Sequence, residues 1–459
     1  MHQKHTCRRA FLKRAGHIAA AAMVPTIIPA SALARGPAPA PSDRITMGVI
    51  GLGGQGTFNM RAFIHQPDTQ LVALCDVEKG NDTYDMLKRW GGTGWAGLEP
   101  GKQEALKNYE QMGKSLSPAS IATYTDFREL LARQDIDAVC IATPDHWHGL
   151  ISLAALQAGK DVYCEKPLVN SVAEGRAVVD AVRKYRRVLQ TGSHERSNDS
   201  VRYACELVRN GRIGTLQEIH VNMPNRDAHH LMLINNTDPK PPMPVPESLD
   251  YDFWLGPAPW ADYTRERTHF WWRFITDYGG GEMTDRGAHI IDLAQFINDT
   301  DDSGPVAIRA KGKALQGGLY DAFIEYDFEC EYANGVKMIG GSEGDRGLKL
   351  VGSQGWIFIH IHGGRLEASN PELLKETIGA TEIHVGRSPG HHRNFLDCVI
   401  DRQQPVAHAE IGHRTATICH LLNIGLLNET PLKWDPVTEQ VLNHRESDRL
   451  CTRPMRSPW

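Results

Sequence analysis

The sequence predicts an α/β protein in which a doubly wound parallel-sheet domain is followed by an α/β domain with an open, mostly antiparallel sheet. Apolar strands alternate with helical segments between residues 45 and 190, as in a parallel sheet covered by helices on both faces. A glycine-rich turn, Gly51-Leu52-Gly53-Gly54-Gln55-Gly56, joins the first strand to the first helix. From about residue 193 the later strands follow one another without intervening helices.

The first domain contains five predicted strands and four well-marked helices. The strands are Ile45–Ile50, Leu71–Cys75, Ala138–Ala142, Asp161–Cys164 and Val188–Gln190, and the helices are Thr57–Ile64, Phe127–Ala132, His146–Ala158 and one opening at Ser171. Asp126 is placed to cap the second helix, Gly159 to end the third, and Ser171 with Glu174 to form a capping box. Residues 77–124, which include Gly91-Gly92-Thr93-Gly94, are interpreted as a helix plus an irregular insertion.

The second domain is predicted from its adjacent strands. The strands are Leu216–Met223, Ile308–Ala314, Ala322–Phe328, Val336–Gly341, Leu348–Val351 and Trp356–Ile361, with helices at Val201–Arg209, Arg393–Ile400 and His413–Leu427. We place the first domain at residues 44–192, the second at 193–435 and a C-terminal tail at 436–459, with a Pro/Ala-rich linker at 35–43.

The composition is that of a globular chain. The 459 residues suffice for two or three domains, with 41% hydrophobic and 23% charged residues. A net charge of -5 argues against a nucleic-acid partner. The nine cysteines include no Cys-x-x-Cys pair, so we expect no disulfide framework, although one or two bridges would be compatible with export.

Residues 1–34 resemble a twin-arginine signal peptide. Arg8-Arg9 lies ahead of an alanine-rich apolar run over residues 18–24, and Ala32-Leu33-Ala34 is a small-x-small cleavage site. The run is too short to form a stable membrane span. We therefore expect an exported, periplasmic protein whose partners include the twin-arginine export machinery, which moves folded proteins. The alternative is an amphipathic N-terminus with no targeting role.

The glycine-rich turn has the context of a Rossmann dinucleotide site. Gly51 permits the tight turn, Gly53 lets the backbone approach a pyrophosphate, and Gly56 allows close packing of helix and strand. Gly54 and Gln55 lie in the same loop, where the helix N-terminus offers N–H groups to phosphates. Asp76 ends the next strand and is placed to bind a ribose diol, which favours NAD over NADP. The alternative is a glycine-rich turn of another α/β fold.

Three further motifs resemble the glucose–fructose oxidoreductase and inositol dehydrogenase (Gfo/Idh/MocA) family. They are Thr143-Pro144-Asp145-His146-Trp147-His148, Glu165-Lys166-Pro167, and the segment from Gly279 to Asp292 with its Asp285-x-x-x-His289 pair. The resemblance covers most of the chain after the signal peptide. It implies a Rossmann domain, then a substrate-binding domain whose open sheet forms a homodimer or homotetramer.

The resemblance also implies catalytic roles. His289 serves as general acid or base, Lys166 stabilises a developing alkoxide, and Asp285 orients substrate hydroxyls or the histidine. Histidine suits proton transfer because its ordinary pKa lies near neutrality. If a helix begins at Thr284 or Asp285, the Asp285 and His289 side chains share one helix face. Taken singly, Asp285 is better interpreted as a helix cap and His289 as a buried core histidine. Together with Lys166 and the glycine-rich turn, the two residues favour a catalytic role.

Other residues are expected around the cofactor and the substrate. Thr143, Pro144 and His148 follow a strand end, where ligands bind in open α/β sheets, and Glu165 and Lys166 follow the next strand. Candidate substrate residues are His194, Trp272, Arg273, Asp285 and His289, with Glu195 also facing the cleft. Trp147 is equally a stacking or a packing residue. The pairs His146-x-His148 and His360-x-His362 lack further ligands at short spacing, so we expect no metal.

We therefore expect an exported NAD(P)-dependent oxidoreductase, with NAD tightly bound, that transfers hydride at a secondary hydroxyl or keto carbon of a sugar, polyol or glycoside. One alternative is an NAD-dependent enzyme that cleaves glycosides through a transient keto-sugar, although such enzymes usually lack the Glu165-Lys166-Pro167 motif. Another alternative is a non-catalytic sugar- or nucleotide-binding protein.

Overall fold

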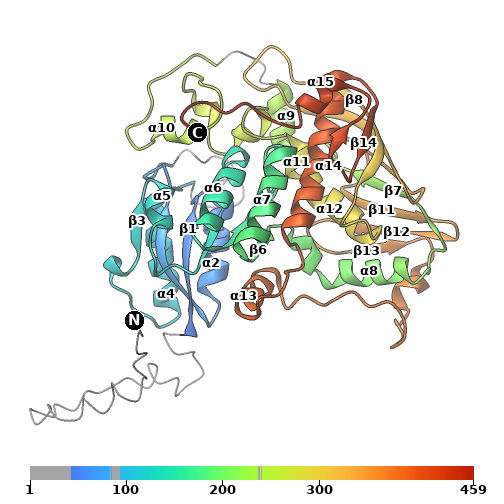
Figure 1. Cartoon of the computed structure of the whole chain (residues 1–459), viewed down its shortest axis with the longest axis horizontal. Helices are drawn as coiled ribbons and strands as arrows, with labels where there is room; N and C mark the ends of the chain where they lie inside the picture. Colours follow the sequence, from blue (N-terminus) through green and yellow to red (C-terminus); the bar gives the residue numbers. More distant parts are fainter. Residues whose placement is uncertain (1–42, 83, 85–93, 236–237, 239) are drawn as a thin grey trace, which may run out of the picture. The chain divides into compact units, whose positions relative to one another are not determined.

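The first sheet has six parallel strands in the order β3-β2-β1-β4-β5-β6 (Figure 1). The strands are β1 (Ile45–Ile50), β2 (Thr69–Cys75), β3 (Ala122–Tyr124), β4 (Ala138–Ile141), β5 (Asp161–Cys164) and β6 (Leu189–Thr191). The strand order reverses between β1 and β4, and an open α/β sheet binds its ligands at the carboxyl ends of such strands. The predicted parallel sheet is confirmed.

The computed structural model describes residues 43–82, 84, 94–235, 238 and 240–459. The predicted signal peptide, nearly all of the linker and Gly91-Gly92-Thr93 lie outside the described residues. Residues Ile45–Trp459 form one compact unit. Among the described helices, none combines the length and apolar character that crossing a bilayer requires. The described cysteines are buried and free of disulfides.

Helices cover both faces of the first sheet. They are α2 (Gly54–Ile64), α4 (Leu98–Gln111), α5 (Phe127–Leu131), α6 (Asp145–Gln157) and α7 (Val172–Tyr185). Helices α5, α6 and α7 share one apolar core with the sheet, and α2 and α4 share another. Asp126 caps α5 as predicted. At the predicted capping box, the Ser171 hydroxyl accepts from the Glu174 N–H at 3.3 Å, and the Glu174 carboxylate accepts from the Asn170 N–H at 3.0 Å.

The second sheet has nine strands in the order β13-β12-β11-β7-β10-β9-β8-β14-β15. The strands are β7 (Leu216–Asn222), β8 (Pro305–Ala314), β9 (Phe323–Tyr332), β10 (Lys337–Gly341), β11 (Gly347–Gly352), β12 (Gly355–His360), β13 (Leu366–Ala368), β14 (Leu432–Asp435) and β15 (Gln440–Val441). Only β7 and β10 pair in parallel; the other neighbouring strands of this sheet are antiparallel. The predicted open, mostly antiparallel sheet is confirmed.

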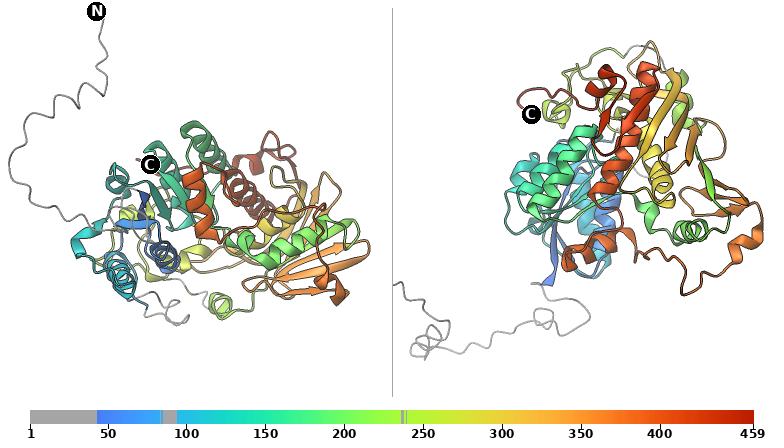
Figure 2. Two further views of the ribbon diagram at one scale, coloured as in Figure 1. Left: turned by 90° about the horizontal axis from the view of Figure 1, so that it is seen from below. Right: turned by 45° about the vertical axis from the view of Figure 1, so that its right-hand side comes forward.

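Three long helices pack on one face of the second sheet (Figure 2). They are α8 (Asp199–Arg209), α12 (Gly287–Ile297) and α14 (Ala409–Asn428). Helix α14 also packs against α7, so it joins the two sheets through their helices (Figure 1). The shorter helices are α9 (Ala228–Asn235), α10 (Tyr251–Leu255), α11 (Glu282–Asp285) and α15 (Arg445–Arg449), with 3-10 turns at Pro118–Ser120, His194–Ser197 (η5), Arg265–Arg267, Trp271–Phe274 and Pro371–Lys375.

Two C-terminal segments return to earlier parts of the fold. Helix α13 (His391–Asp401) places Phe395 and Leu396 in the apolar core formed by the first sheet and α2. Residues 436–459, predicted as a tail, contain β15 and α15, and β15 pairs with β14. The Trp459 ring packs edge-on against Trp147.

A buried ion-pair network fixes the turn η5 to helix α12 and to the residues that follow it. The Arg196 guanidinium contacts the Asp292 carboxylate of α12 at 2.7 Å and the Asp301 carboxylate at 2.7 Å. The Thr415 hydroxyl of α14 donates to the other Asp292 oxygen at 3.1 Å. Since the Arg196 and Asp292 side chains are both buried, neither charge can be left without its partner at low cost.

We expect Arg196→Ala to lower the free energy of unfolding by roughly 3–5 kcal/mol, because it leaves the Asp292 carboxylate buried and unpaired. Urea denaturation followed by tryptophan fluorescence measures the change. Arg387→Ala is the matched control, since the Arg387 side chain is 74% exposed in its pair with Asp199. Equal midpoints for the two variants would show that the buried network does not hold the fold.

Candidate functional site

A cavity of about 1140 Å³ lies at the carboxyl ends of β1, β4 and β5. Its wall includes the predicted site residues except Gly56 and Glu195, together with further residues of the second domain. Those predicted residues are Gly51, Gly53, Gly54, Gln55, Asp76, Thr143, Pro144, His148, Glu165, Lys166, His194, Trp272, Arg273, Asp285 and His289. Segments that are distant in sequence therefore meet at one site.

Two glycines of the loop lie too close to neighbouring backbone atoms to carry a side chain. Gly51 has φ +91°, and a Cβ there would lie 2.6 Å from the carbonyl oxygen of Ala142. A Cβ on Gly56 would lie 1.9 Å from the carbonyl oxygen of Gly51. Helix α2 begins at Gly54, and no side chain caps its N-terminus. Its first N–H groups therefore remain available to an anion such as a pyrophosphate.

The Asp76 carboxylate lies beside this loop. It accepts hydrogen bonds from the Leu52 N–H at 2.6 Å and the Glu78 N–H at 2.9 Å, one to each oxygen. Burial raises the pKa of Asp76 to about 6, against the lowering effect of those two N–H groups. Each carboxylate oxygen keeps a lone pair for a further donor, such as a ribose hydroxyl.

Glu165 and His148 link neighbouring segments of the site through hydrogen bonds. The Glu165 carboxylate accepts from Gln55 at 3.1 Å and Asn59 at 2.9 Å, so it ties the β5 loop to α2. The His148 ring nitrogens face the carbonyl oxygens of Pro167 at 2.6 Å and Thr143 at 2.9 Å. Burial lowers the pKa of His148. The polar atoms of Glu165 and His148 thus form hydrogen bonds within the protein. The predicted contacts of these residues to a cofactor stay predictions.

The Lys166 ammonium forms an ion pair with Asp285 across the cavity wall. Its Nζ lies 2.6 Å from the Asp285 carboxylate and 2.9 Å from the Asp285 carbonyl oxygen. The Arg273 guanidinium lies 3.4 Å from the same carboxylate oxygen. Burial alone would raise the pKa of Asp285, but the charges of Lys166 and Arg273 outweigh it and hold that pKa low. Lys166 follows β5 and Asp285 ends α11, so the pair links the two domains.

His289 is a buried, neutral imidazole beside this pair. Burial lowers the pKa of His289 well below its ordinary value, and the nearby Lys166 charge lowers it further. The ring is therefore unprotonated at neutral pH and able to accept a proton. Asp285 and His289 do not share one continuous helix, because α11 ends at Asp285 and the His289 N–H bonds the Arg286 carbonyl three residues back. The condition for a shared helix face, a helix that begins at Thr284 or Asp285, is therefore not met, yet both residues line the cavity.

Asp145 is a site residue that the sequence analysis did not select. It is the first residue of α6, is buried, and lies 3.4 Å from the Thr284 hydroxyl. Burial raises the pKa of Asp145 to about 8, against the opposing charges of Arg273 and Lys166. The carboxyl group thus keeps a proton at neutral pH. Its position directly after Thr143-Pro144 at a strand end was the available signal.

Of the aromatic and cationic residues predicted near the substrate, Trp272 and Arg273 are available to a ligand, whereas Trp147 is used in packing. The Arg273 guanidinium stacks 4.4 Å above the Trp272 ring, and both residues line the cavity. Trp147 instead stacks on Phe253 and donates its indole N–H to the Trp254 carbonyl, so its ring serves packing. A flat aromatic face beside a guanidinium suits the apolar face and hydroxyls of a sugar.

Two family models match the chain. Residues 102–193 match the model described as "Oxidoreductase family, NAD-binding Rossmann fold", and residues 197–459 match "Oxidoreductase family, C-terminal alpha/beta domain", both of the Gfo/Idh/MocA group. The matched ranges therefore cover most of both domains.

The chain is also similar to curated proteins and to a solved structure. The chain is 25% identical over 274 residues to the uncharacterized oxidoreductase YrbE of Bacillus subtilis, covering 60% of this chain and 59% of that protein. It is 30% identical over 231 residues to a glycosyl hydrolase family 109 protein of Shewanella baltica, covering 47% and 45%. The chain thus spans about half the length of these relatives. The fold resembles that of the WlbA dehydrogenase of Bordetella pertussis in complex with NADH and UDP-GlcNAcA, with TM-score 0.58, 15% identity and coverage of 85% and 99%.

We expect Gly56→Ala to weaken NAD binding at least tenfold, because the new methyl group collides with the Gly51 carbonyl oxygen and displaces the loop. Isothermal titration calorimetry with NAD measures the affinity. Gly304→Ala is the matched control, since a Cβ at Gly304 meets open space. Equal affinities for the two variants would contradict the assignment of the loop.

We expect the affinity for NAD to fall as the pH drops below about 6, where Asp76 takes up its proton. The ionised carboxylate accepts both ribose hydroxyls, and protonation removes an acceptor, so binding is stronger above this pKa and weaker below it. Calorimetric titrations with NAD between pH 5 and pH 8 follow the affinity. This range extends from about one unit below to about two units above the Asp76 pKa. Asp76→Asn should bind NAD more weakly and lose this pH dependence; an unchanged profile in the variant would exclude Asp76 as its source.

Proposed function

The chain belongs to the Gfo/Idh/MocA oxidoreductase family, and we propose that it transfers a hydride between NAD and a secondary hydroxyl or keto carbon of a sugar, polyol or glycoside. The observation that carries this proposal is the Lys166–Asp285 ion pair beside neutral His289, on the wall of the cavity that also contains the glycine loop. Bound NAD supplies the hydride acceptor or donor at its nicotinamide ring.

The residues of the first domain fit a dinucleotide. The glycine loop and the α2 N-terminus hold the pyrophosphate, and Asp76 holds the adenosine ribose through its free lone pairs. The Thr143 hydroxyl is buried and finds no hydrogen-bond partner among residues 43–82, 84, 94–235, 238 and 240–459, so it is free for a ligand at the nicotinamide end. The negative charge of Asp76 disfavours a 2′-phosphate, which supports NAD over NADP.

The residues around Lys166 fit proton transfer during the oxidation of an alcohol. As the hydride leaves carbon, the hydroxyl proton passes to a ring nitrogen of His289, which is unprotonated at neutral pH. The Lys166 ammonium stabilises the alkoxide that forms, and Asp285 holds that ammonium in place at 2.6 Å. In the reverse direction His289 returns the proton to the reduced oxygen.

A second candidate function is cleavage of a glycoside through a transient keto-sugar. The similarity to a glycosyl hydrolase family 109 protein favours it, and so does Asp145, whose carboxyl group keeps its proton at neutral pH on the same cavity wall. A protonated carboxyl is suited to protonate a leaving oxygen. A third candidate, a non-catalytic sugar- or nucleotide-binding protein, would not require the Lys166–Asp285–His289 arrangement.

Export and tight retention of NAD are further parts of this proposal. The twin-arginine pattern of residues 1–34 supports delivery to the periplasm after folding, and an exported enzyme gains from keeping one cofactor through many cycles. A homodimer or homotetramer formed through the second sheet is proposed from the family resemblance. The strands β8 and β9 carry ion pairs such as Lys313–Glu325, so such an interface would be polar. Light scattering of the purified protein gives its stoichiometry.

We expect Lys166→Ala to retain NAD binding and to lower turnover about 10²–10⁴-fold, since it removes the charge beside the reacting oxygen. The assay mixes purified protein with a panel of sugars, polyols and glycosides and follows the absorbance of reduced nicotinamide. Lys337→Ala is the control, because Lys337 lies on β10 and pairs with Glu329. Absence of any spectral change with every compound would favour the non-catalytic binding protein.

A further inference from the structure

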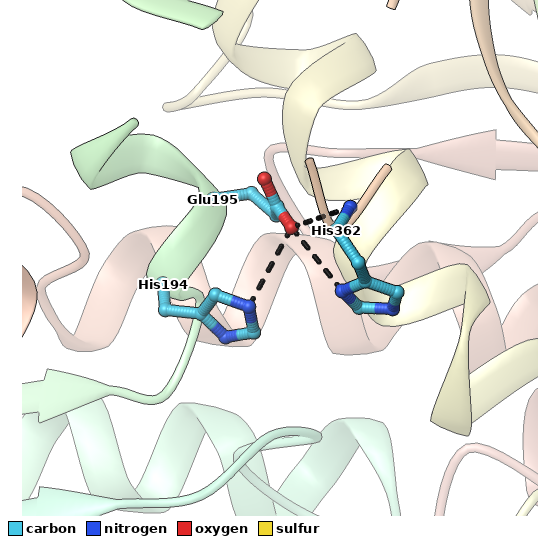
Figure 3. A group of neighbouring side chains, drawn as sticks. All are labelled: His194, Glu195 and His362. Carbon is cyan, nitrogen blue, oxygen red and sulfur yellow. Dashed lines mark hydrogen bonds and ion pairs between the residues drawn. The ribbon is translucent and has the colours of Figure 1, made fainter. Parts of the chain in front are cut away.

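Two imidazoles and a carboxylate converge at one edge of the cavity. His194 and Glu195 belong to η5, and His362 lies in the turn between β12 and β13 (Figure 3). The His194 Nε2 lies 3.5 Å and the His362 Nδ1 3.2 Å from the same Glu195 oxygen, Oε1. The three ligand atoms all lie within 4.8 Å of one another. The two histidine side chains are each 43% exposed and line the cavity, whereas Glu195 is buried behind them.

These separations suit a shared cation better than a pair of hydrogen bonds. An N–H···O hydrogen bond is about 2.7–3.2 Å long, so the His194 contact exceeds this range and the His362 contact lies at its upper end. In a tetrahedral zinc site with bonds of about 2.0–2.2 Å, neighbouring ligand atoms lie about 3.3–3.6 Å apart. The distances of 3.2 and 3.5 Å to Glu195 Oε1 are close to such tetrahedral edges.

The backbone holds the three ligands in place. His362 has φ +63°, a left-handed conformation that is uncommon for a residue with a side chain. Its N–H donates to Glu195 Oε1 at 3.0 Å, which joins two segments 167 residues apart in sequence. Arg196, the residue after Glu195, is fixed by its buried pair with Asp292. Uncommon backbone geometry that its surroundings enforce is typical of functional sites.

His289 lies next to the cluster and has a buried ring nitrogen without a partner in the described part of the chain. Its ring centroid lies 4.8 Å from that of His194 and 5.3 Å from that of His362. His289 is 6% exposed, and its Nδ1 is buried without a hydrogen-bond partner in the described part of the chain. A buried polar nitrogen without a partner is costly, and a bound ligand or its water would satisfy it.

We propose that His194 Nε2, Glu195 Oε1 and His362 Nδ1 bind a divalent transition-metal ion of the Zn²⁺ class. Three protein ligands leave one position open toward the cavity and His289, as in catalytic zinc sites. There the ion takes a water molecule or a substrate oxygen and acts as a Lewis acid on it. This site goes beyond the proposed hydride transfer and does not depend on it.

His362 lies far from His194 and Glu195 in the sequence, which is why the sequence alone predicted no metal. That expectation rested on the short-range pairs His146-x-His148 and His360-x-His362. The His146 Nε2 faces the Trp254 carbonyl oxygen at 3.0 Å, and His360 pairs with Glu367 at 2.9 Å. His362 instead lies beside His194 and Glu195 of η5, which only folding brings close to it.

A second His-containing cluster, formed by Asp227, His229 and His230, does not carry the same inference. The Asp227 carboxylate is already paired with the guanidinium groups of Arg286 and Arg346. His230 is paired with the Glu282 carboxylate at 2.7 Å. Fixed positive charges next to the carboxylate disfavour a metal cation there. At the proposed site, in contrast, the Lys166 ammonium on the cavity wall is paired with Asp285.

Metal binding is tested directly on the purified full chain, without an activity assay. After treatment with a chelator and its removal, calorimetric titration with Zn²⁺ should show one tight site per chain. Titration with Co²⁺ should give the visible absorption of a four-coordinate ion with nitrogen and oxygen ligands. We expect His194→Ala, Glu195→Gln and His362→Ala each to weaken the binding at least about 100-fold.

His360→Ala is the matched control, because it removes a nearby histidine that is paired with Glu367 outside the cluster. Circular dichroism of each variant shows whether it is folded, and Glu195→Gln retains an acceptor for the His362 N–H. The proposal is overturned if the wild-type chain binds no Zn²⁺ at micromolar concentration, or if the three variants bind it as well as His360→Ala does. Either result leaves the NAD and hydride-transfer proposal standing.

Discussion

The ion pair between Lys166 and Asp285 is the constraint on which the rest of the site depends. A lysine at the end of β5 is held in a partly buried cavity, where a lone ammonium would be costly. The carboxylate that pairs with it comes from α11, and α14 and α7 keep the two sheets together around it. Formation of the site is thereby coupled to packing of the second domain on the first.

The ion pair and the burial around it set the protonation states of Asp285, His289 and Asp145. The positive charge of Lys166 keeps Asp285 ionised and helps to keep His289 neutral, while burial leaves a proton on Asp145. One wall of the cavity therefore offers a cation, a proton acceptor and a proton donor at neutral pH. Groups whose environments drive their pKa values apart are typical of acid–base catalysis.

The sequence predicted the parts of the site that depend on local chemistry. The glycine loop followed by Asp76 and the lysine ahead of Pro167 are short motifs whose geometry follows from glycine, proline and strand ends. The parallel character of the first sheet and the mostly antiparallel character of the second followed from whether helices alternate with the strands. These features need no knowledge of distant contacts.

The features that escaped the sequence analysis depend on contacts between distant segments. The proton on Asp145 results from burial in the folded chain, and the return of α13 to the first sheet was not visible in its own sequence. His362 gains its partners only when the β12–β13 turn meets η5. Burial and convergence of this kind are properties of the folded chain.

The central claim is that this cavity moves a hydride between a sugar carbon and NAD. The direct measurement incubates the NAD-loaded protein with carbon-deuterated sugars, releases the cofactor by denaturation and analyses it by mass spectrometry. Hydride transfer from the sugar carbon would leave one deuterium on the nicotinamide ring of the wild-type protein and none in the Lys166→Ala protein. Cofactor that stays unlabelled while the wild-type protein converts the sugar would contradict it.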